Sequence, residues 1–174
     1  MTKKMFLNGL AHGQADVIQQ MLSMLHDMNI DYCVIGGLAV NAYAEPVVNL
    51  DLDLAIAVDA IPPLIKAAQQ MFAIKEFPHS IILKSTDSEL RLQIQTDPRY
   101  QAFIPRAIWQ NLMGYEMKVA ALEDVLQGKI WAWSDETRRK SKRQKDLADI
   151  FRLVEGRPHL LAQLPESIKA LYQA

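Results

Sequence analysis

The sequence is poor in cysteine and in net charge. Its 174 residues include a single cysteine, Cys33, so an internal disulfide and a cluster of thiolate metal ligands are both excluded. Because Cys33 lies in an apolar run, we expect it to be a small buried hydrophobic residue. Lys and Arg number 19 and Asp and Glu number 20, which gives a net charge of −1. Such a composition favours neither a nucleic-acid coat protein nor a disordered chain.

Long hydrophobic runs are missing as well. No stretch is long enough to span a bilayer, and the N-terminus carries lysines without the apolar core of a signal peptide. We therefore expect a cytoplasmic protein with no membrane contact. The length fits a single domain over residues 1–174, with enough chain for a sizeable core. Within it we expect a core at about 31–120 and a C-terminal helical part at about 121–174.

The most informative stretch runs from residue 32 to residue 58. It opens with a short apolar run that predicts a strand and that ends at Gly36 and Gly37. Glycines at this point let the chain turn sharply and let a backbone or a phosphate approach closely. A segment of small residues follows and predicts a short helix, whose free N–H groups can face an anion. The stretch ends in a second strand pattern.

Two acidic residues, Asp51 and Asp53, lie on this second strand. Residues two apart on a strand point to the same face, so the two carboxylates stand side by side, while leucines, an isoleucine and Val58 fill the other face. Adjacent carboxylates repel one another unless a cation lies between them, and hard oxygen ligands suit Mg²⁺. A carboxylate pair near an anion-binding turn is the outline of a site for Mg²⁺ and a nucleoside triphosphate.

The rest of the chain predicts an α/β (α+β) fold with a mixed central sheet, flanking helices and a C-terminal helical segment. Apolar residues recur at helical spacing in several segments, and alternating patterns lie between them. The predicted helices cover residues 15–28, 63–71, 100–109, 122–133, 146–154 and 165–174. The further predicted strands cover residues 81–84, 90–95 and 116–120.

The order strand, Gly-Gly, short helix and Asp-x-Asp resembles the nucleotidyltransferase superfamily with the DNA polymerase β-like fold. The likeness is strongest to its small bacterial branch of AbiEii-type toxins, in which Gly-Gly-x-Ala precedes Glu-Pro-Arg-x-Thr-x-Asp-x-Asp. Here residues 36–39 read Gly-Gly-Leu-Ala and residues 45–53 read Glu-Pro-Val-Val-Asn-Leu-Asp-Leu-Asp. The frame matches, but Val47 stands at the arginine position and Asn49 at the threonine position.

The resemblance implies a third carboxylate on a neighbouring strand, where it completes the metal site or deprotonates the attacking hydroxyl. The matching position is Gln93, or else Gln95. Glutamine is neutral, so it ligates a metal weakly and cannot act as a base near neutral pH. Asp97 lies further along the same face and is another candidate for the catalytic acid. It precedes Pro98, so the alternative is that it begins a turn.

A basic segment, residues 138–145, carries six lysines and arginines. It is either a solvated linker with a first helical turn, or a positive cradle for a triphosphate or an RNA backbone. By resemblance, Lys129 and Lys145 face the phosphates and Asp146 braces the basic side chains. We also expect Arg143 to help neutralise the triphosphate.

Two functions are consistent with these residues. The first is a nucleotidyltransferase that depends on Mg²⁺, with two metal ions held by Asp51 and Asp53. In this enzyme Gly36, Gly37 and Asn49 touch the triphosphate. By resemblance the acceptor is an RNA end such as tRNA, or a protein hydroxyl. The enzyme is then of the toxin type, with an antitoxin-type protein as its partner.

The second function is binding without turnover. Val47, Asn49 and Gln93 all depart from the pattern of the active branch. A scaffold that has lost its third carboxylate can retain a nucleotide, an RNA or a protein as a ligand while its catalytic rate falls. The survival of Asp51 and Asp53 favours the enzyme.

Overall fold

The computed structural model describes residues 1–13 and 15–174. Its centre is a seven-stranded mixed sheet with the strand order β3-β4-β5-β2-β1-β7-β6. The strands are β1 (Tyr32–Ile35), β2 (Asp51–Ile56), β3 (Ala73–Phe77), β4 (Ser80–Lys84), β5 (Arg91–Gln95), β6 (Ile108–Leu112) and β7 (Tyr115–Val119). A mixed sheet with flanking helices confirms the predicted fold class.

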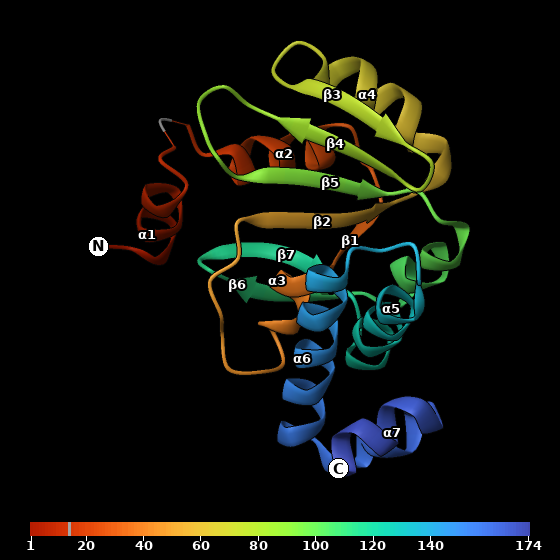
Figure 1. The fold of residues 1–174 in the computed structure, drawn as a ribbon. Helices are drawn as coiled ribbons and strands as arrows, with labels where there is room; N and C mark the ends of the chain where they lie inside the picture. Colours follow the sequence, from red (N-terminus) through yellow and green to blue (C-terminus); the bar gives the residue numbers. More distant parts are fainter. Residues whose placement is uncertain (14) are drawn as a thin grey trace.

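Helices cover both faces of the sheet, with α2 and α4 behind it and α3, α5 and α6 in front of it in Figure 1. The α-helices are α1 (Lys3–Leu10), α2 (Val17–Asp27), α3 (Gly36–Val40), α4 (Ile61–Ala68), α5 (Leu122–Ser134), α6 (Lys140–Gly156) and α7 (Glu166–Gln173). Short 3₁₀ segments are η1 (Val58–Ala60), η2 (Pro98–Arg106) and η3 (Pro158–Gln163). Among the described residues, none of these helices has the length and apolarity to cross a membrane.

The strand β2 lies at the middle of the sheet and sets the register of the acidic residues. It runs antiparallel to β1 and parallel to β5. This pairing places Asp53 between Ile35 and Gln93, and Asp51 beside Arg91. The alternate residues of β2 are fully buried on the opposite face, as the period of two predicts. The carboxylates therefore share the face of the sheet that α5 and α6 cover.

Burial of one helical face explains why α2 forms where the sequence predicts it. Asp16 caps the helix, because its side chain accepts a hydrogen bond from the Gln19 backbone N–H at 3.0 Å. Five of its apolar residues are buried against the core. Each such side chain contributes about 1.5–3 kcal/mol relative to an exposed one. Cys33 is also fully buried, and burial raises the pKa of its thiol to about 12, so it is a core residue.

Some boundaries differ from the sequence prediction. Strand β2 ends at Ile56, and Val58 lies in η1 with 62% of its surface exposed, so it is no part of the core face. The segment predicted as a helix at 100–109 is instead the 3₁₀ segment η2 followed by β6. A proline at position 105 explains this, because its nitrogen has no hydrogen to donate to an α-helix.

Candidate active site

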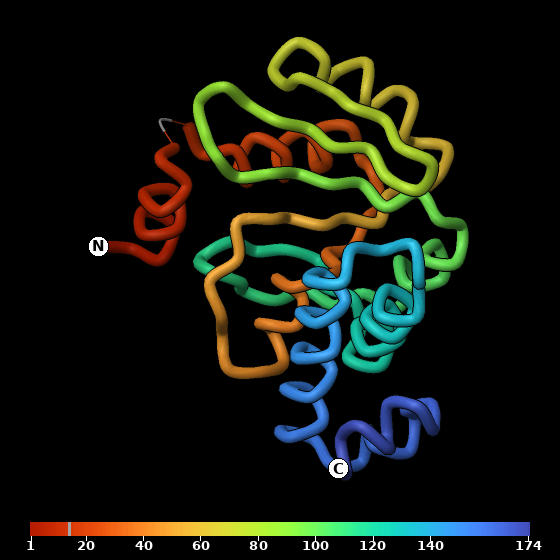
Figure 2. Tube along the Cα trace, in the orientation of Figure 1, coloured from red at the N-terminus to blue at the C-terminus, as the bar shows by residue number. Residues whose placement is uncertain are grey.

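A cavity of about 590 Å³ lies between β2, the loop at residues 41–50 and helix α6. Figure 2 shows this loop leaving α3 and running beside α6 before it enters β2. On the sheet side the cavity is lined by Gly37, Asn41, Val47, Asn49, Asp51 and Asp53. The sequence therefore predicted several residues that the fold brings to one place.

The two carboxylates on β2 have different partners. Asp51 accepts a hydrogen bond from the Arg91 Nε at 3.0 Å and forms an ion pair with it. Burial and, to a smaller extent, the nearby charge of Asp51 raise the pKa of Asp53 to about 6, although Lys129, Arg91 and Arg138 act in the opposite direction. The negative charge of Asp53 is thus incompletely balanced by the protein.

The glycine corner gives space to these same side chains. Gly36 has a φ of +71°, and a Cβ on it would lie 2.3 Å from the Asp53 Oδ2. A Cβ on Gly37 would lie 2.0 Å from the Asn49 Nδ2. The Asn49 Oδ1 in turn accepts from the Asp51 backbone N–H at 2.8 Å. The corner therefore leaves room for the Asp53 carboxylate and the Asn49 amide, and its predicted contact with phosphate stays a prediction.

Gln93 stands beside Asp53 on the neighbouring strand β5, as predicted. Both residues line a small adjoining cavity of about 80 Å³, together with Gln95. Within residues 1–13 and 15–174, the structure contains no group of three or more Asp, Glu, His or Cys side chains placed to hold a metal. The position that the resemblance assigns to a third carboxylate carries the neutral amide of Gln93.

Asp97 does not join the carboxylate pair. It caps η2 by accepting from the Arg99 backbone N–H at 3.0 Å, and it forms an ion pair with the Arg99 guanidinium at 2.8 Å. These contacts hold the pKa of Asp97 below its usual value. Its side chain lines a different cavity, which lies next to His79 and Trp131. Asp97 therefore begins a turn, which was the alternative prediction for this residue.

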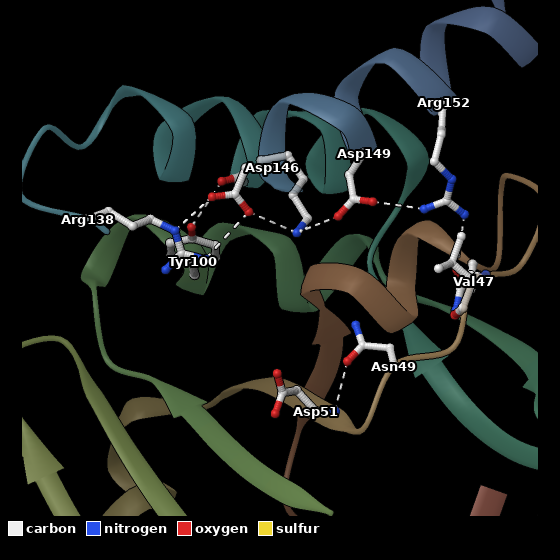
Figure 3. Close-up of polar contacts among 11 residues, drawn as sticks. Val47, Asn49, Asp51, Tyr100, Arg138, Asp146, Asp149 and Arg152 are labelled. Carbon is white, nitrogen blue, oxygen red and sulfur yellow. Dashed lines mark hydrogen bonds and ion pairs between the residues drawn. The ribbon is translucent and has the colours of Figure 1, made fainter. Parts of the chain in front are cut away.

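The wall opposite the carboxylates is a network of paired charges (Figure 3). Asp146 is only 1% exposed, and it accepts from the Lys129 Nζ at 3.1 Å and from the Arg138 Nε at 2.7 Å. The Lys129 Nζ also lies 2.9 Å from the Asp149 Oδ2. Burial alone would lower the pKa of Lys129, but the Asp149 and Asp146 carboxylates outweigh it and raise the pKa. The predicted bracing role of Asp146 is confirmed.

Arg152 extends this network to the loop at residues 41–50 (Figure 3). Its Nη1 donates to the Asp149 Oδ1 at 2.8 Å, and its Nη2 donates to the Asn41 Oδ1 at 3.2 Å and to the Glu45 carbonyl. The sequence reading missed Arg152 and Asn41. The sequence could have indicated the contact between Asp149 and Arg152, because side chains three positions apart on a helix are neighbours.

The basic segment belongs mostly to α6 and is divided between two roles. Lys142 and Lys145 line the cavity, and within the described part of the chain neither forms an ion pair. The Arg143 Nε instead donates to the Trp133 carbonyl at 2.6 Å, and Arg143 does not line the cavity. Lys145 therefore lies where the sequence predicts it, whereas Arg143 binds the end of α5.

The donor set fits one Mg²⁺. Asp51 and Asp53 offer carboxylate oxygens on one face, and the raised pKa of Asp53 shows that a further cation is electrostatically favoured. Mg²⁺ in phosphate-transfer sites is commonly held by one or two carboxylates together with substrate phosphates. A second metal ion would have only the neutral Gln93 as an additional protein ligand, so the expected two-metal arrangement stays a prediction.

Comparison with protein families gives one match over most of the chain. A family model described as the nucleotidyl transferase AbiEii toxin of the type IV toxin–antitoxin system matches residues 54–174. The match begins directly after Asp53, so the glycine corner and the carboxylate pair lie before it. No curated protein matches the sequence.

Several solved nucleotidyltransferases share the fold. The lincosamide antibiotic adenylyltransferase LnuA, bound to lincomycin, is 12% identical with a TM-score of 0.56, over 82% of this chain and 99% of that chain. ANT(2'')-Ia in complex with adenylyl-2''-tobramycin is 16% identical with a TM-score of 0.57, over 90% and 95%. A nucleotidyltransferase-like protein from Paracoccidioides brasiliensis is 20% identical with a TM-score of 0.56, over 88% and 83%. At these identities the likeness shows the fold, and the predicted fold is confirmed.

Proposed function

The chain belongs to the AbiEii nucleotidyltransferase toxin family, and from this membership we propose that it transfers a nucleoside monophosphate from a nucleoside triphosphate to an acceptor hydroxyl. One observation carries the proposal. The carboxylates of Asp51 and Asp53 face, across one cavity, a helix that presents lysines and arginines. A divalent cation and a polyphosphate need these opposite kinds of charge within a few ångströms of each other.

The polyphosphate would lie along the α6 side of the cavity. Lys142 and Lys145 have no acidic partner among the described residues, so their charges are available to phosphate oxygens. Asn49 and Gly37 line the opposite side near the carboxylates. Mg²⁺ bound by the two aspartates would neutralise charge on the phosphates and on the departing pyrophosphate.

The transfer would proceed as a displacement at the α-phosphorus. The acceptor oxygen forms a bond to this phosphorus, while the bond from phosphorus to the bridging oxygen breaks and pyrophosphate leaves. The proton of the hydroxyl passes to water, because Gln93 is neutral and accepts no proton near neutral pH. General-base help is typically worth about 10²–10⁴-fold, so we expect a slow enzyme.

For the acceptor we propose an RNA end such as tRNA, or a protein hydroxyl. The match to a toxin family of a toxin–antitoxin system supports an enzyme of the toxin type with an antitoxin-type protein partner. Cations on α6 favour an acceptor or donor that carries phosphates.

A second candidate function is nucleotide, RNA or protein binding without turnover. Gln93 favours it, because the position next to Asp53 lacks the carboxylate that would complete the site. The ion pair between Arg91 and Asp51 favours it too, because a bound guanidinium competes with a metal for the same carboxylate. The two functions differ in whether a covalent product forms.

Labelling with radioactive nucleotides separates the two. Purified protein is mixed with Mg²⁺, each α-³²P-labelled nucleoside triphosphate in turn, and either total RNA or cell lysate. We expect a labelled acceptor with the wild type, and none with Asp51→Asn or Asp53→Asn. Asp59→Asn is the matched control, because Asp59 is an exposed acid outside the cavity. It should label as the wild type does.

Metal-dependent nucleotide binding by the wild type without any labelled acceptor would select the binding function. Equal labelling by Asp53→Asn and the wild type would reject the assignment of the carboxylate pair.

A further inference from the structure

We propose that Arg152 is a polyphosphate-binding residue of this cavity and that it ties nucleotide binding to the position of the loop at residues 41–50. The inference rests on the proposed nucleotide site and adds a residue to it. Its basis is a juxtaposition: one guanidinium on α6 lines the cavity and contacts both a network carboxylate and the loop that leads to Asp51.

The guanidinium has capacity left for a ligand. Arginine carries five N–H donors. In Arg152 one N–H donates to Asp149 and two donate to Asn41 and the Glu45 carbonyl. The other two have no hydrogen-bond partner among residues 1–13 and 15–174. The side chain is 22% exposed, and it faces the cavity together with Asn49. The free donors are the Nε–H and one Nη1–H, and each can donate a charge-assisted hydrogen bond to a phosphate oxygen.

The helix wall of the cavity is the network of Lys129, Arg138, Asp146, Asp149 and Arg152, and its charge balance also favours an anion. Three cations, Lys129, Arg138 and Arg152, share two carboxylates, Asp146 and Asp149. One positive charge is therefore left over in the network itself. The contacts run from Arg138 through Asp146, Lys129 and Asp149 to Arg152, so this excess is shared along the network and Arg152 is one of its two ends. A bound phosphate would remove that excess.

Contacts through Asn41 connect this guanidinium to the metal side of the cavity. The Asn41 side chain accepts from the Val47 backbone N–H at 3.0 Å and donates to the Val47 carbonyl at 2.7 Å, which fixes the loop. Two residues later, Asn49 accepts from the backbone N–H of Asp51. A phosphate drawn to Arg152 would therefore also hold the loop that places Asp51 (Figure 3).

Arg157 provides a matched control on the same helix end. Its guanidinium donates to the Tyr43 carbonyl of the same loop and lies 5.8 Å from the centre of the Tyr43 ring. Unlike Arg152, it does not line the cavity. Removing Arg157 therefore weakens the attachment of the loop without removing a charge from the ligand space.

The test measures binding calorimetrically with α,β-methylene analogues of the four nucleoside triphosphates in the presence of Mg²⁺. Arg152→Ala should weaken binding by about tenfold or more, because charge-assisted hydrogen bonds are lost. Arg152→Lys keeps the cation but loses the planar set of N–H donors that reaches the loop, Asp149 and the ligand together, and it should weaken binding by about threefold. Arg157→Ala should stay within about twofold of the wild type. Circular dichroism and thermal melting report the folding of each variant.

A rescue variant separates ligand contact from loop support. Val47 is 55% exposed and lines the same cavity, so an arginine at position 47 can reach the space that Arg152 occupies. In Arg152→Ala we expect Val47→Arg to restore most of the lost affinity.

Unchanged binding by Arg152→Ala or by Arg152→Lys would overturn the inference. So would an equal loss with Arg157→Ala, because that result assigns the effect to the loop alone. Failure of Val47→Arg to restore binding would also contradict it. If the wild type binds none of the four analogues, the proposed nucleotide site itself is rejected.

Discussion

The two walls of the cavity, the sheet wall formed by β2 and the helix wall formed by α5 and α6, differ in how their charges are balanced. On the sheet wall, Asp51 and Asp53 stand side by side, and the pKa of Asp53 is raised to about 6 by its burial and by the charge of Asp51. On the helix wall, Asp146 accepts hydrogen bonds from two different cations. The helix wall pairs its charges around Asp146 and Asp149 and keeps a net positive charge that suits an anion, whereas the sheet wall gains from an added cation. The ion pairs of the helix wall therefore add rigidity beside a surface for an anion, whereas the carboxylates of the sheet wall provide the binding capacity for a cation.

Removing the carboxylate at the centre of the helix wall should produce the largest effect. Asp146→Ala leaves Lys129, whose side chain is 11% exposed, with one carboxylate partner and leaves Arg138 with none in this network. Breaking a buried ion pair by removing one partner typically costs about 3–5 kcal/mol. We expect a loss of this size in the free energy of unfolding, measured by urea denaturation.

The control for Asp146→Ala is an exposed pair on the last helix. Glu166 pairs with Lys169 at 3.1 Å, and its side chain is 90% exposed. Glu166→Ala should therefore change the unfolding free energy by no more than about 0.5 kcal/mol. If both variants lose the same small amount, the helix wall is no more rigid than a solvated surface, and the contrast between the walls disappears.

A change on the sheet wall should act on turnover. Gln93→Asp introduces the carboxylate that is absent beside Asp53. If metal binding or proton removal limits the rate, this variant should raise the rate of transfer by about 10²-fold, the lower end of the usual general-base effect. The rate of acceptor labelling with saturating Mg²⁺ measures it.

The same variant has a distinct signature without metal. A third negative charge next to Asp51 and Asp53 increases repulsion, so Gln93→Asp should melt at a lower temperature than the wild type, and Mg²⁺ should remove most of that difference. Gln93→Asn keeps the wall neutral and serves as the control. An unchanged rate and an Mg²⁺-independent melting temperature in Gln93→Asp would show that position 93 does not face the metal.

Regular periodicity made the sheet wall predictable from sequence. The strand at 32–35 was predicted with the bounds that the structure shows, and the shared face of Asp51 and Asp53 follows from the period of two alone. The edge strands β3 and β6 were missed. Ala73–Phe77 is mostly exposed, so it has no alternation of buried and exposed residues to detect.

The helix wall was harder to predict because it depends on contacts between distant segments. Arg143 and Lys145 are two positions apart on α6 and point in different directions, so only the packing of α6 against α5 decides which of them faces the cavity. Arg91 was missed for a similar reason. Its place beside Asp51 follows from the parallel pairing of β2 with β5, and the sequence of either strand does not contain that register.

The smallest expected effect is a dependence of stability on pH that comes from the sheet wall. Asp53 has a pKa of about 6 in the folded protein, compared with about 3.9 in an unfolded chain. Between these values the folded state keeps a proton that the unfolded state has released, so stability falls as pH rises from about 4 to about 6 and stays lower above that. The full shift corresponds to about 3 kcal/mol, and we expect about 1–2 kcal/mol because Asp53 lines the cavity, where solvent screens part of the effect.

Subtracting the pH profile of Asp53→Asn from that of the wild type isolates the contribution of Asp53. Asp97 and Asp135, whose pKa values are lowered in the folded state, contribute stability that is lost as pH falls, and this opposite slope is common to both proteins. Urea denaturation at a series of pH values should give a difference curve that declines between pH 4 and 6. Mg²⁺ should flatten that curve, because a bound cation stabilises the charged form of Asp53. A flat curve without Mg²⁺ would mean that the charge of Asp53 is as well balanced as that of Asp146 on the helix wall.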